Sequence, residues 1–290
     1  MNAAGELSIE EAAGRLGVHY MTVYRYVRLG RLPAEHRDGR WHIRPEDLEP
    51  LRGGARRARG TGDPPAAARA DHRGGADDAD SVSGRLADRL VAGDVNGAWS
   101  IVEGALLAGA PATVYTEILA PALRSLGEGW ESGRLSVAEE HRATALALGI
   151  VGRLGPLFRR RGRRRPGQVL LAGVEGDSHV IPLMMVADML RAGGFEVVHL
   201  GADVPVSTLV PFAAVTPQLR AIGLSASTDA SAVRAAGVIA ALRERVGDLP
   251  IVLGGPAVGS EAAARSAGAD GWARDAAGAL ELITTLAGAR

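Results

Sequence analysis

Hydrophobic and polar positions follow different rhythms in successive parts of the 290-residue chain. In residues 1–52, apolar positions recur at helical spacing, and arginines cluster on the polar positions between them. Residues 53–84 have no apolar period and are rich in Gly, Ala, Pro and charged residues, which is typical of a flexible linker. The pattern therefore predicts an N-terminal module that a linker separates from the remaining chain.

The rest of the chain divides again into a helical and a mixed part. Residues 85–163 contain several segments of helical period joined by short polar turns, which predict an antiparallel four-helix bundle. From residue 164 onward, short strand-like apolar runs alternate with helical segments. This alternation predicts parallel strands joined by crossover helices, so we expect residues 164–290 to form a doubly wound α/β domain in a multidomain protein.

The composition of the chain excludes several classes of site and targeting signal. The chain has no Cys, which excludes disulfides, thiolate metal sites and a cysteine nucleophile. No run of 18 apolar residues occurs and the N-terminus is polar and acidic, so we expect no membrane span and interpret the protein as cytoplasmic. Because the formal net charge is zero, any affinity for nucleic acid must come from a local patch.

The N-terminal module has the order of elements expected of a DNA-binding domain. Ser8 and Glu11 have the spacing of a capping box at the start of a first helix, and Gly17 provides the turn. A second helix is predicted from residue 20 to residue 29, and the Asp-Gly turn of "DGRWHI" predicts a hairpin after it. The candidate DNA contacts lie on that second helix and on the hairpin: Thr22, Tyr24, Arg25, Arg28 and Arg40.

This module resembles the excisionase-like and MerR-like winged helix-turn-helix families through "TVYRYVRLGRLPA" and "GRWHIRPEDL". The resemblance covers about 45 residues and implies that the second helix enters the major groove of double-stranded DNA, at an operator. Arg25, Arg28 and Arg40 would then contact phosphates or base edges, whereas we expect Trp41 to pack in the core of the wing.

The stretch "GVEGDSHVIPL" places Asp177 and His179 directly after a buried strand. Ligands of doubly wound sheets bind at the carboxyl ends of strands, where "SAS" after "AIGL" and "GG" after "IVL" also lie. Asp177 can accept a hydrogen bond from one imidazole nitrogen of His179, as the carboxylate beside a metal-ligating histidine does. No other His or acid cluster completes a metal cage, so a metal at His179 would have to arrive already coordinated in a cofactor.

"DSHVIP", "LSAS" and "LGGPA" resemble the motifs of the Rossmann-like (flavodoxin-like) cobalamin-binding domain, which are Asp-x-His-x-x-Gly, Ser-x-Leu and Gly-Gly. The resemblance covers residues 168–290 and implies that His179 is the lower axial ligand of cobalt. Pro182 replaces the motif glycine, which we expect to stiffen the loop, and Ser227 replaces the motif leucine. The implied cofactor-binding residues of this domain are Asp177, Ser178, His179, Val180, Ser225, Ser227, Gly254 and Gly255.

A second motif lies in the predicted bundle, where Trp130 is followed after nine residues by Glu140 and His141. At helical spacing, Val137, Glu140 and His141 share one flank of a helix. This arrangement resembles the adenosyl-binding cap of the CarH/LitR photoreceptor family, in which a histidine follows the Trp. Here Glu131 takes that position, so the chain lacks the histidine that would bind the upper face of cobalt.

The combined resemblance to the CarH/LitR family implies a light-responsive transcriptional repressor with no enzyme activity. It would bind adenosylcobalamin between the bundle and the α/β domain. The protein would form a homo-oligomer, either a tetramer or a dimer, and photolysis would change its oligomeric state and its affinity for DNA. Three alternatives stay open. They are a cobalamin-responsive regulator in which light is not the signal, a corrinoid methyl carrier, and a regulator that has lost cobalamin.

Overall fold

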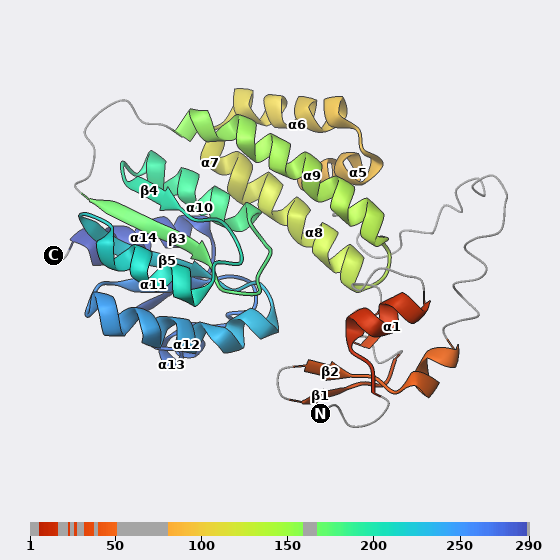
Figure 1. The fold of residues 1–290 in the computed structure, drawn as a ribbon. Coiled ribbons are helices and arrows are strands. Elements are labelled where there is room, and N and C mark those ends of the chain that lie inside the picture. Colours follow the sequence, from red (N-terminus) through yellow and green to blue (C-terminus); the bar gives the residue numbers. More distant parts are fainter. Residues whose placement is uncertain are drawn as a thin grey trace. The chain divides into compact units, whose positions relative to one another are not determined.

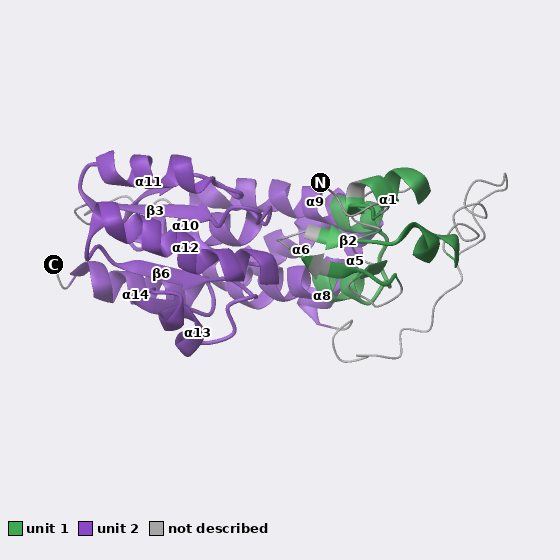
Figure 2. Cartoon of the chain, turned by 60° about the horizontal axis from the view of Figure 1, so that its bottom comes forward, with its two compact units in different colours: residues 1–80, 125–141 green, residues 81–124, 142–290 purple. Residues whose placement is uncertain are grey.

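The structure of the protein is a computed structural model. It describes residues 6–16, 23, 26–27, 32–37, 40–50, 81–158 and 167–288. The chain divides into two compact units, residues 1–80 with 125–141 and residues 81–124 with 142–290, which Figure 2 shows in different colours. None of the helices in the described part of the chain is long and apolar enough to cross a membrane.

The N-terminal part of the first unit contains a helix, a hairpin and a 3-10 turn: α1 (Ile9–Leu16), β1 (Glu35–Arg37), β2 (Arg40–His42) and η1 (Pro45–Leu48). The predicted capping box is confirmed, because Ser8 N donates to Glu11 Oε2 at 2.8 Å and Glu11 N donates to Ser8 Oγ at 3.2 Å. The predicted hairpin is also confirmed as an antiparallel pair, and Trp41 packs against the core of the module as expected.

Most of the predicted DNA-contact residues lie outside the described residues. Thr22, Tyr24, Arg25 and Arg28 are among them, whereas Arg40 is the first residue of β2 and its side chain is not described. Val23 and Val27, which flank three of these positions, are buried in the core of the module. These two apolar positions of the predicted second helix therefore lie in the core.

A series of helices follows, as Figure 1 shows. These are α5 (Val82–Ala92), α6 (Val95–Ala108), α7 (Pro111–Thr113), the π-helix η2 (Val114–Leu119), α8 (Ala120–Glu131), α9 (Val137–Leu154) and the 3-10 helix η3 (Gly155–Phe158). The predicted helical bundle is confirmed. α5 begins at Val82, where Ser81 Oγ accepts from Gly84 N at 2.9 Å, so the last three residues of the segment expected to be a linker are helical.

The predicted doubly wound α/β domain is confirmed in the second unit. Its elements are β3 (Gln168–Gly173), α10 (Ile181–Ala192), β4 (Glu196–His199), α11 (Val206–Val215), β5 (Leu219–Ser225), α12 (Asp229–Val246), β6 (Ile251–Gly254), α13 (Glu261–Ser266), β7 (Gly271–Ala273) and α14 (Ala276–Gly288). The strands pair in parallel in the order β4-β3-β5-β6-β7. β7 adds a strand that the apolar pattern did not predict, because only three residues form it.

Both faces of this sheet are covered by helices, which explains the unbroken apolar runs in its strands. Successive residues of β3 point to opposite faces, so Leu170 and Ala172 belong to one buried cluster and Val169 and Leu171 to the other. The strands are therefore anchored on two sides. Their carboxyl ends hold the loops that follow them in fixed positions.

Candidate cofactor site

The three loops singled out in the sequence lie together at the carboxyl edge of the sheet. Val174 N donates to the Ser225 carbonyl at 2.9 Å, and Ala226 N donates to the Gly254 carbonyl at 2.9 Å. These bonds join the loops after β3, β5 and β6. The connections after β3 and after β4 lead to strands on opposite sides of β3, so this edge is also the topological switch point where doubly wound sheets bind ligands.

Asp177 and His179 form a directed pair in the loop after β3. The imidazole Nδ1 lies 2.8 Å from Asp177 Oδ1, and the backbone N–H of His179 donates to the same oxygen at 3.0 Å. Since an ionised carboxylate only accepts hydrogen bonds, Nδ1 carries the proton and Nε2 presents the lone pair that a metal would bind. The side chain of Asp177 is 1% exposed and that of His179 is 54% exposed, so the carboxylate is a buried anchor for an accessible ring.

The second carboxylate oxygen of Asp177 ties this loop to the one after β5. Oδ2 accepts from the backbone N–H of Ser227 and, at 3.2 Å, from the hydroxyl of Ser231. Burial alone would raise the pKa of Asp177, but the hydrogen bonds from the His179 ring and from the backbone N–H groups of His179 and Ser227 hold it below its ordinary value. Asp177 is therefore ionised at neutral pH and can fix the orientation of the imidazole.

Ser231 supports Asp177 at the candidate site, and the sequence motifs did not include it. It is fully buried, and its hydroxyl both bonds to Asp177 and accepts from Thr228 N at 3.0 Å. Thr228 Oγ1 in turn accepts from Ser231 N at 3.2 Å, which makes a capping box at the start of α12. The Thr-x-x-Ser spacing after "SAS" is the signal that could have identified it.

The chemistry of the side chains at this edge suits a corrinoid. His179 offers one nitrogen ligand, and no group of three or more His, Cys, Asp or Glu side chains that could form a metal cage occurs among the described residues. Ser225 is buried at the end of β5. The hydroxyl oxygen of Ser227 is buried and has no hydrogen-bond partner within the described part of the chain, which leaves a polar group available for a ligand that enters the loop.

Pro182 was expected to stiffen the loop after His179, but it lies in a helix. It does not stiffen the loop after His179, because α10 already begins at Ile181 and Pro182 lies in its first turn. The first N–H groups of a helix have no partner within the helix, so a proline there removes no hydrogen bond. The loop that carries His179 is consequently short and ends in a proline-initiated helix.

Gly255 and Gly254 are required by the protein backbone itself. Gly255 has φ +109°, and a Cβ there would overlap the Ala226 carbonyl oxygen and lie 2.8 Å from Ala226 N. A Cβ on Gly254 would lie 2.8 Å from the Ala273 carbonyl oxygen. Close packing of the loop after β6 on its neighbours therefore explains both glycines, whatever ligand passes over them.

Replacement of Gly255 by alanine is expected to lower the free energy of unfolding by about 2–3 kcal/mol, because the side chain meets both positive φ and backbone atoms. Gly237→Ala is a matched control on the exposed side of α12, where a Cβ meets nothing within 4 Å. That change should stabilise the protein by about 0.5–1 kcal/mol through helix propensity. Urea unfolding of both variants measures the difference, and equal stabilities would contradict it.

The predicted adenosyl-side residues belong to the first unit. Trp130, which is half-buried, and Glu131, which is exposed, end α8, whereas Val137, Glu140 and His141 lie in the first turns of α9. His141 Nδ1 lies 2.6 Å from Glu140 Oε2. A further capping box, in which Ser136 N donates to Glu139 Oε2 at 2.8 Å, fixes the start of α9. The sequence spacing therefore brings Glu140 and His141 into direct contact.

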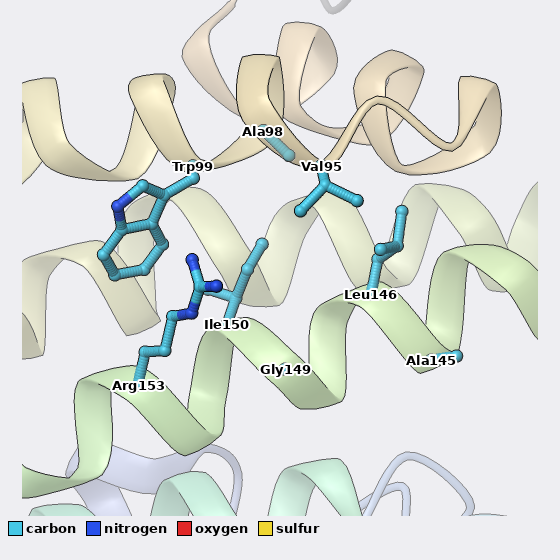
Figure 3. A pocket seen from close by; sticks show the side chains of 8 residues that line it. All are labelled: Val95, Ala98, Trp99, Ala145, Leu146, Gly149, Ile150 and Arg153. Atoms are coloured by element: carbon cyan, nitrogen blue, oxygen red, sulfur yellow. The ribbon is translucent and has the colours of Figure 1, made fainter.

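A small hollow of about 100 Å³ lies elsewhere, between α6 and α9 of the second unit (Figure 3). Its lining is mainly apolar, and Arg153 lies over the Trp99 ring with its guanidinium carbon 4.9 Å from the ring centroid. The lining residues are Val95, Ala98, Trp99, Ala145, Leu146, Gly149, Ile150 and Arg153. None of them is a predicted cofactor residue, so this hollow is separate from the candidate site.

Comparisons with known proteins agree with this geometry. One model of a B12 binding domain matches residues 167–281, a second model of a B12 binding domain matches residues 82–154, and a helix-turn-helix domain model matches residues 6–50. The structure of the monomethylamine corrinoid protein of Methanosarcina barkeri is similar with a TM-score of 0.60 and 26% identity, over 70% of this chain and 97% of that chain.

Two curated relatives differ in the part of the chain that they share. The HTH-type transcriptional repressor CarH of Myxococcus xanthus is 34% identical over 56% of this chain and 54% of its own length. Methionine synthase of Mycobacterium tuberculosis is 28% identical over 71% of this chain but only 18% of its own length. The chain thus spans less than two thirds of either relative. With a match to a helix-turn-helix domain ahead of matches to two B12 binding domains, the chain belongs to the B12-binding proteins.

Proposed function

We propose that the chain is a light-responsive transcriptional repressor of the cytoplasm that binds adenosylcobalamin and double-stranded DNA. The observation that carries the proposal is the Asp177–His179 pair, which presents one nitrogen ligand at the ligand-binding edge of the sheet. A single protein ligand suits a metal that is already held in a corrinoid. The helix-turn-helix match at residues 6–50 supports a role in regulation.

Within this proposal, Nε2 of His179 would ligate the cobalt of the corrinoid, and Asp177 keeps the ring in the required tautomer and orientation. The buried hydroxyls of Ser225 and Ser227 and the backbone at Gly254 and Gly255 would hold the nucleotide part of the cofactor. Ser178 and Val180 line the same loop beside His179. When bound, adenosylcobalamin supplies a cobalt–carbon bond that light can break.

The adenosyl group is assigned to the helical segment that ends α8 and begins α9. Trp130 offers a flat apolar ring, and the Glu140–His141 pair offers hydrogen-bonding groups for a ribose diol. Val137 lies one turn before His141 on the same helix and adds an apolar contact. These residues would distinguish adenosylcobalamin from corrinoids that lack the adenosyl group.

DNA binding is assigned to the N-terminal module, with Thr22, Tyr24, Arg25, Arg28 and Arg40 as contacts. Several such modules in one homo-oligomer would bind an operator with an avidity that a single module lacks. If the oligomer forms only with the intact cofactor, light lowers the affinity for DNA without any change in the DNA-contact residues. This links the B12 binding domains to transcription.

A second candidate function is a cobalamin-responsive regulator in which light is not the signal. Glu131 favours it, because an exposed carboxylate stands where the CarH/LitR pattern has a histidine for the upper face of cobalt. A corrinoid carrier for an enzyme is less favoured. The similarity to the monomethylamine corrinoid protein extends over 70% of this chain, but a carrier has no use for a helix-turn-helix domain.

The test adds adenosylcobalamin to the full chain in the dark and records the visible absorption, the molecular mass and DNA binding before and after green light. We expect a bound corrinoid, an oligomer in the dark, and a loss of mass and DNA affinity on illumination. Hydroxocobalamin, which lacks the adenosyl group, is the ligand control, and Trp130→Ala is the variant control for the adenosyl contact. Sequence-specific DNA is obtained by selection from random double-stranded fragments.

The possible outcomes separate the candidates. Failure to bind any corrinoid would exclude both regulators. A bound corrinoid whose mass and DNA affinity respond to the ligand but not to light would establish the second candidate. A bound corrinoid together with no affinity for any DNA would favour a carrier.

A further inference from the structure

A buried hydrogen bond joins the helical bundle to the α/β domain within the second unit. The hydroxyl of Tyr115, on the π-helix η2, donates to Asp188 Oδ2 of α10 at 2.8 Å. Tyr115 is fully buried and Asp188 is 5% exposed. The Tyr115 ring also stacks on Phe158 of η3, with centroids 4.6 Å apart and planes at 23°. One side chain of the bundle therefore reaches a carboxylate that the α/β domain holds away from water.

The environment of Asp188 makes this contact decisive for how the two domains pack. Its other oxygen accepts from Arg191 Nη1 at 2.9 Å, so Tyr115 and Arg191 are its side-chain partners in the described residues. Removal of the Tyr115 donor leaves one oxygen of a buried carboxylate without a hydrogen bond, which costs more than the loss of an exposed one, although Arg191 still pairs with the other oxygen. The carboxylate therefore favours the docked bundle strongly over one that has moved away.

The protonation states of Tyr115 and His199 favour the hydrogen bond from Tyr115 to Asp188. Burial, followed by the charge of Asp188 and the hydrogen bond to it, raises the pKa of Tyr115, so the hydroxyl remains a donor. Burial and then Arg191 lower the pKa of His199, at the end of β4, although Asp188 opposes the shift. His199 is therefore neutral at pH 7 and places no second positive charge beside Asp188.

The segment that carries Tyr115 is wound in a way that allows movement. In η2, Ala120 N donates to the Tyr115 carbonyl, five residues earlier. Pro121 follows, and in an α-helix its ring would collide with the carbonyl of Glu117, which accounts for the wider turn. A π-turn holds one residue more than an α-turn, so rewinding would rotate the preceding residues by about 100° relative to α8. Such a rotation would remove Tyr115 from Asp188.

The helix that carries Asp188 also leads directly to the candidate cofactor site. α10 begins at Ile181, two residues after His179, and Asp188 lies two turns further along the same helix. A short helix transmits displacement as a rigid body. Movement of the bundle at Asp188 is therefore communicated to the loop that positions the imidazole.

We propose that the Tyr115–Asp188 hydrogen bond is a latch that holds the bundle on the α/β domain and couples the position of the bundle to His179. The latch itself needs no ligand, whereas its coupling to a bound corrinoid rests on the function proposed above. Release of the latch, with rewinding of η2, undocks the bundle and alters the setting of His179. This assigns a regulatory role to residues outside both predicted cofactor motifs.

The latch is tested first by hydrogen exchange on the full chain without cofactor. Tyr115→Phe keeps the ring stacked on Phe158 but removes the hydroxyl. We expect amide exchange in residues 111–119 and 185–190 to accelerate about tenfold or more, while the far strands β6 and β7 keep their protection. Thr116→Val is the matched control, because its hydroxyl lies on the same turn but bonds to the Ala112 carbonyl. Equal acceleration throughout the second unit would overturn the latch.

A double-mutant cycle keeps the test valid if Tyr115→Phe also lowers global stability. Asp188→Asn and the double variant complete the cycle, and the latch requires the double variant to be little worse than the worse single variant. Additive effects on exchange would overturn it.

The coupling is tested by the dissociation rate of hydroxocobalamin, which we expect Tyr115→Phe, but not Thr116→Val, to increase about tenfold. An unchanged rate overturns the coupling. If the wild-type chain binds no corrinoid, the proposed function fails and the coupling fails with it, whereas the exchange result still decides the latch.

Discussion

Replacement of His179 by alanine is expected to weaken corrinoid binding by about a hundredfold or more and to change the visible spectrum from a nitrogen-ligated to a water-ligated form. Asp177 holds the imidazole with Nε2 as the ligand nitrogen, and the described residues contain no group of three or more side chains that could hold a metal without it. Nδ1 of His179 also donates to the buried Asp177 carboxylate, so the apoprotein should lose about 1–2 kcal/mol of stability as well. Equilibrium dialysis, the absorption spectrum and thermal unfolding measure the three quantities.

Two further experiments make this result specific. Addition of free imidazole to His179→Ala should restore the nitrogen-ligated spectrum, because the small molecule can occupy the space of the missing ring. His42→Ala is the control, since His42 contacts Glu6 in the N-terminal module, with 3.2 Å between Nδ1 and Oε2, and should leave corrinoid binding unchanged. An unchanged spectrum in His179→Ala would remove His179 as the axial ligand.

The layout of the site could be predicted from the sequence because it depends on local patterns. The apolar run before Asp177 predicts a buried strand, and the parallel sheet then places the loops of His179, Ser225 and Gly254 at one edge. The Asp177–His179 contact spans two residues, so spacing alone predicts it. Local chemistry and the rules of sheet topology suffice for this much.

The remaining contacts depend on how distant segments pack. Ser231 lies 54 residues from Asp177, and Tyr115 lies 73 residues from Asp188, so no local pattern predicts either pair. Pro182 differs from the expectation because α10 begins at Ile181, so the proline lies in the first turn of a helix and not in the loop. The sequence does not predict β7, because three residues carry too little periodicity to be distinguished from a loop.

Replacement of Asp177 by alanine is expected to lower the free energy of unfolding by about 3–5 kcal/mol even without a cofactor. The carboxylate is 1% exposed and accepts from the His179 ring and backbone, from Ser227 N and from the Ser231 hydroxyl. Its loss leaves the backbone N–H groups of His179 and Ser227 without this acceptor and removes one of the ties between the loops after β3 and β5. Urea unfolding followed by circular dichroism measures the effect, and a loss below about 1 kcal/mol would contradict this account.

Asp177→Asn distinguishes the charge from the shape of this group. Because the folded pKa of Asp177 is below its unfolded value, its ionised form stabilises the native state above pH 4 or so, and this contribution is lost as the pH falls through the folded pKa. The asparagine variant should lack that part of the acid dependence. It should also bind corrinoid about 10–100 times more weakly, because an amide cannot hold the His179 ring as the carboxylate does. Acid profiles that coincide for the wild type and Asp177→Asn would show that the carboxylate charge does not stabilise this loop.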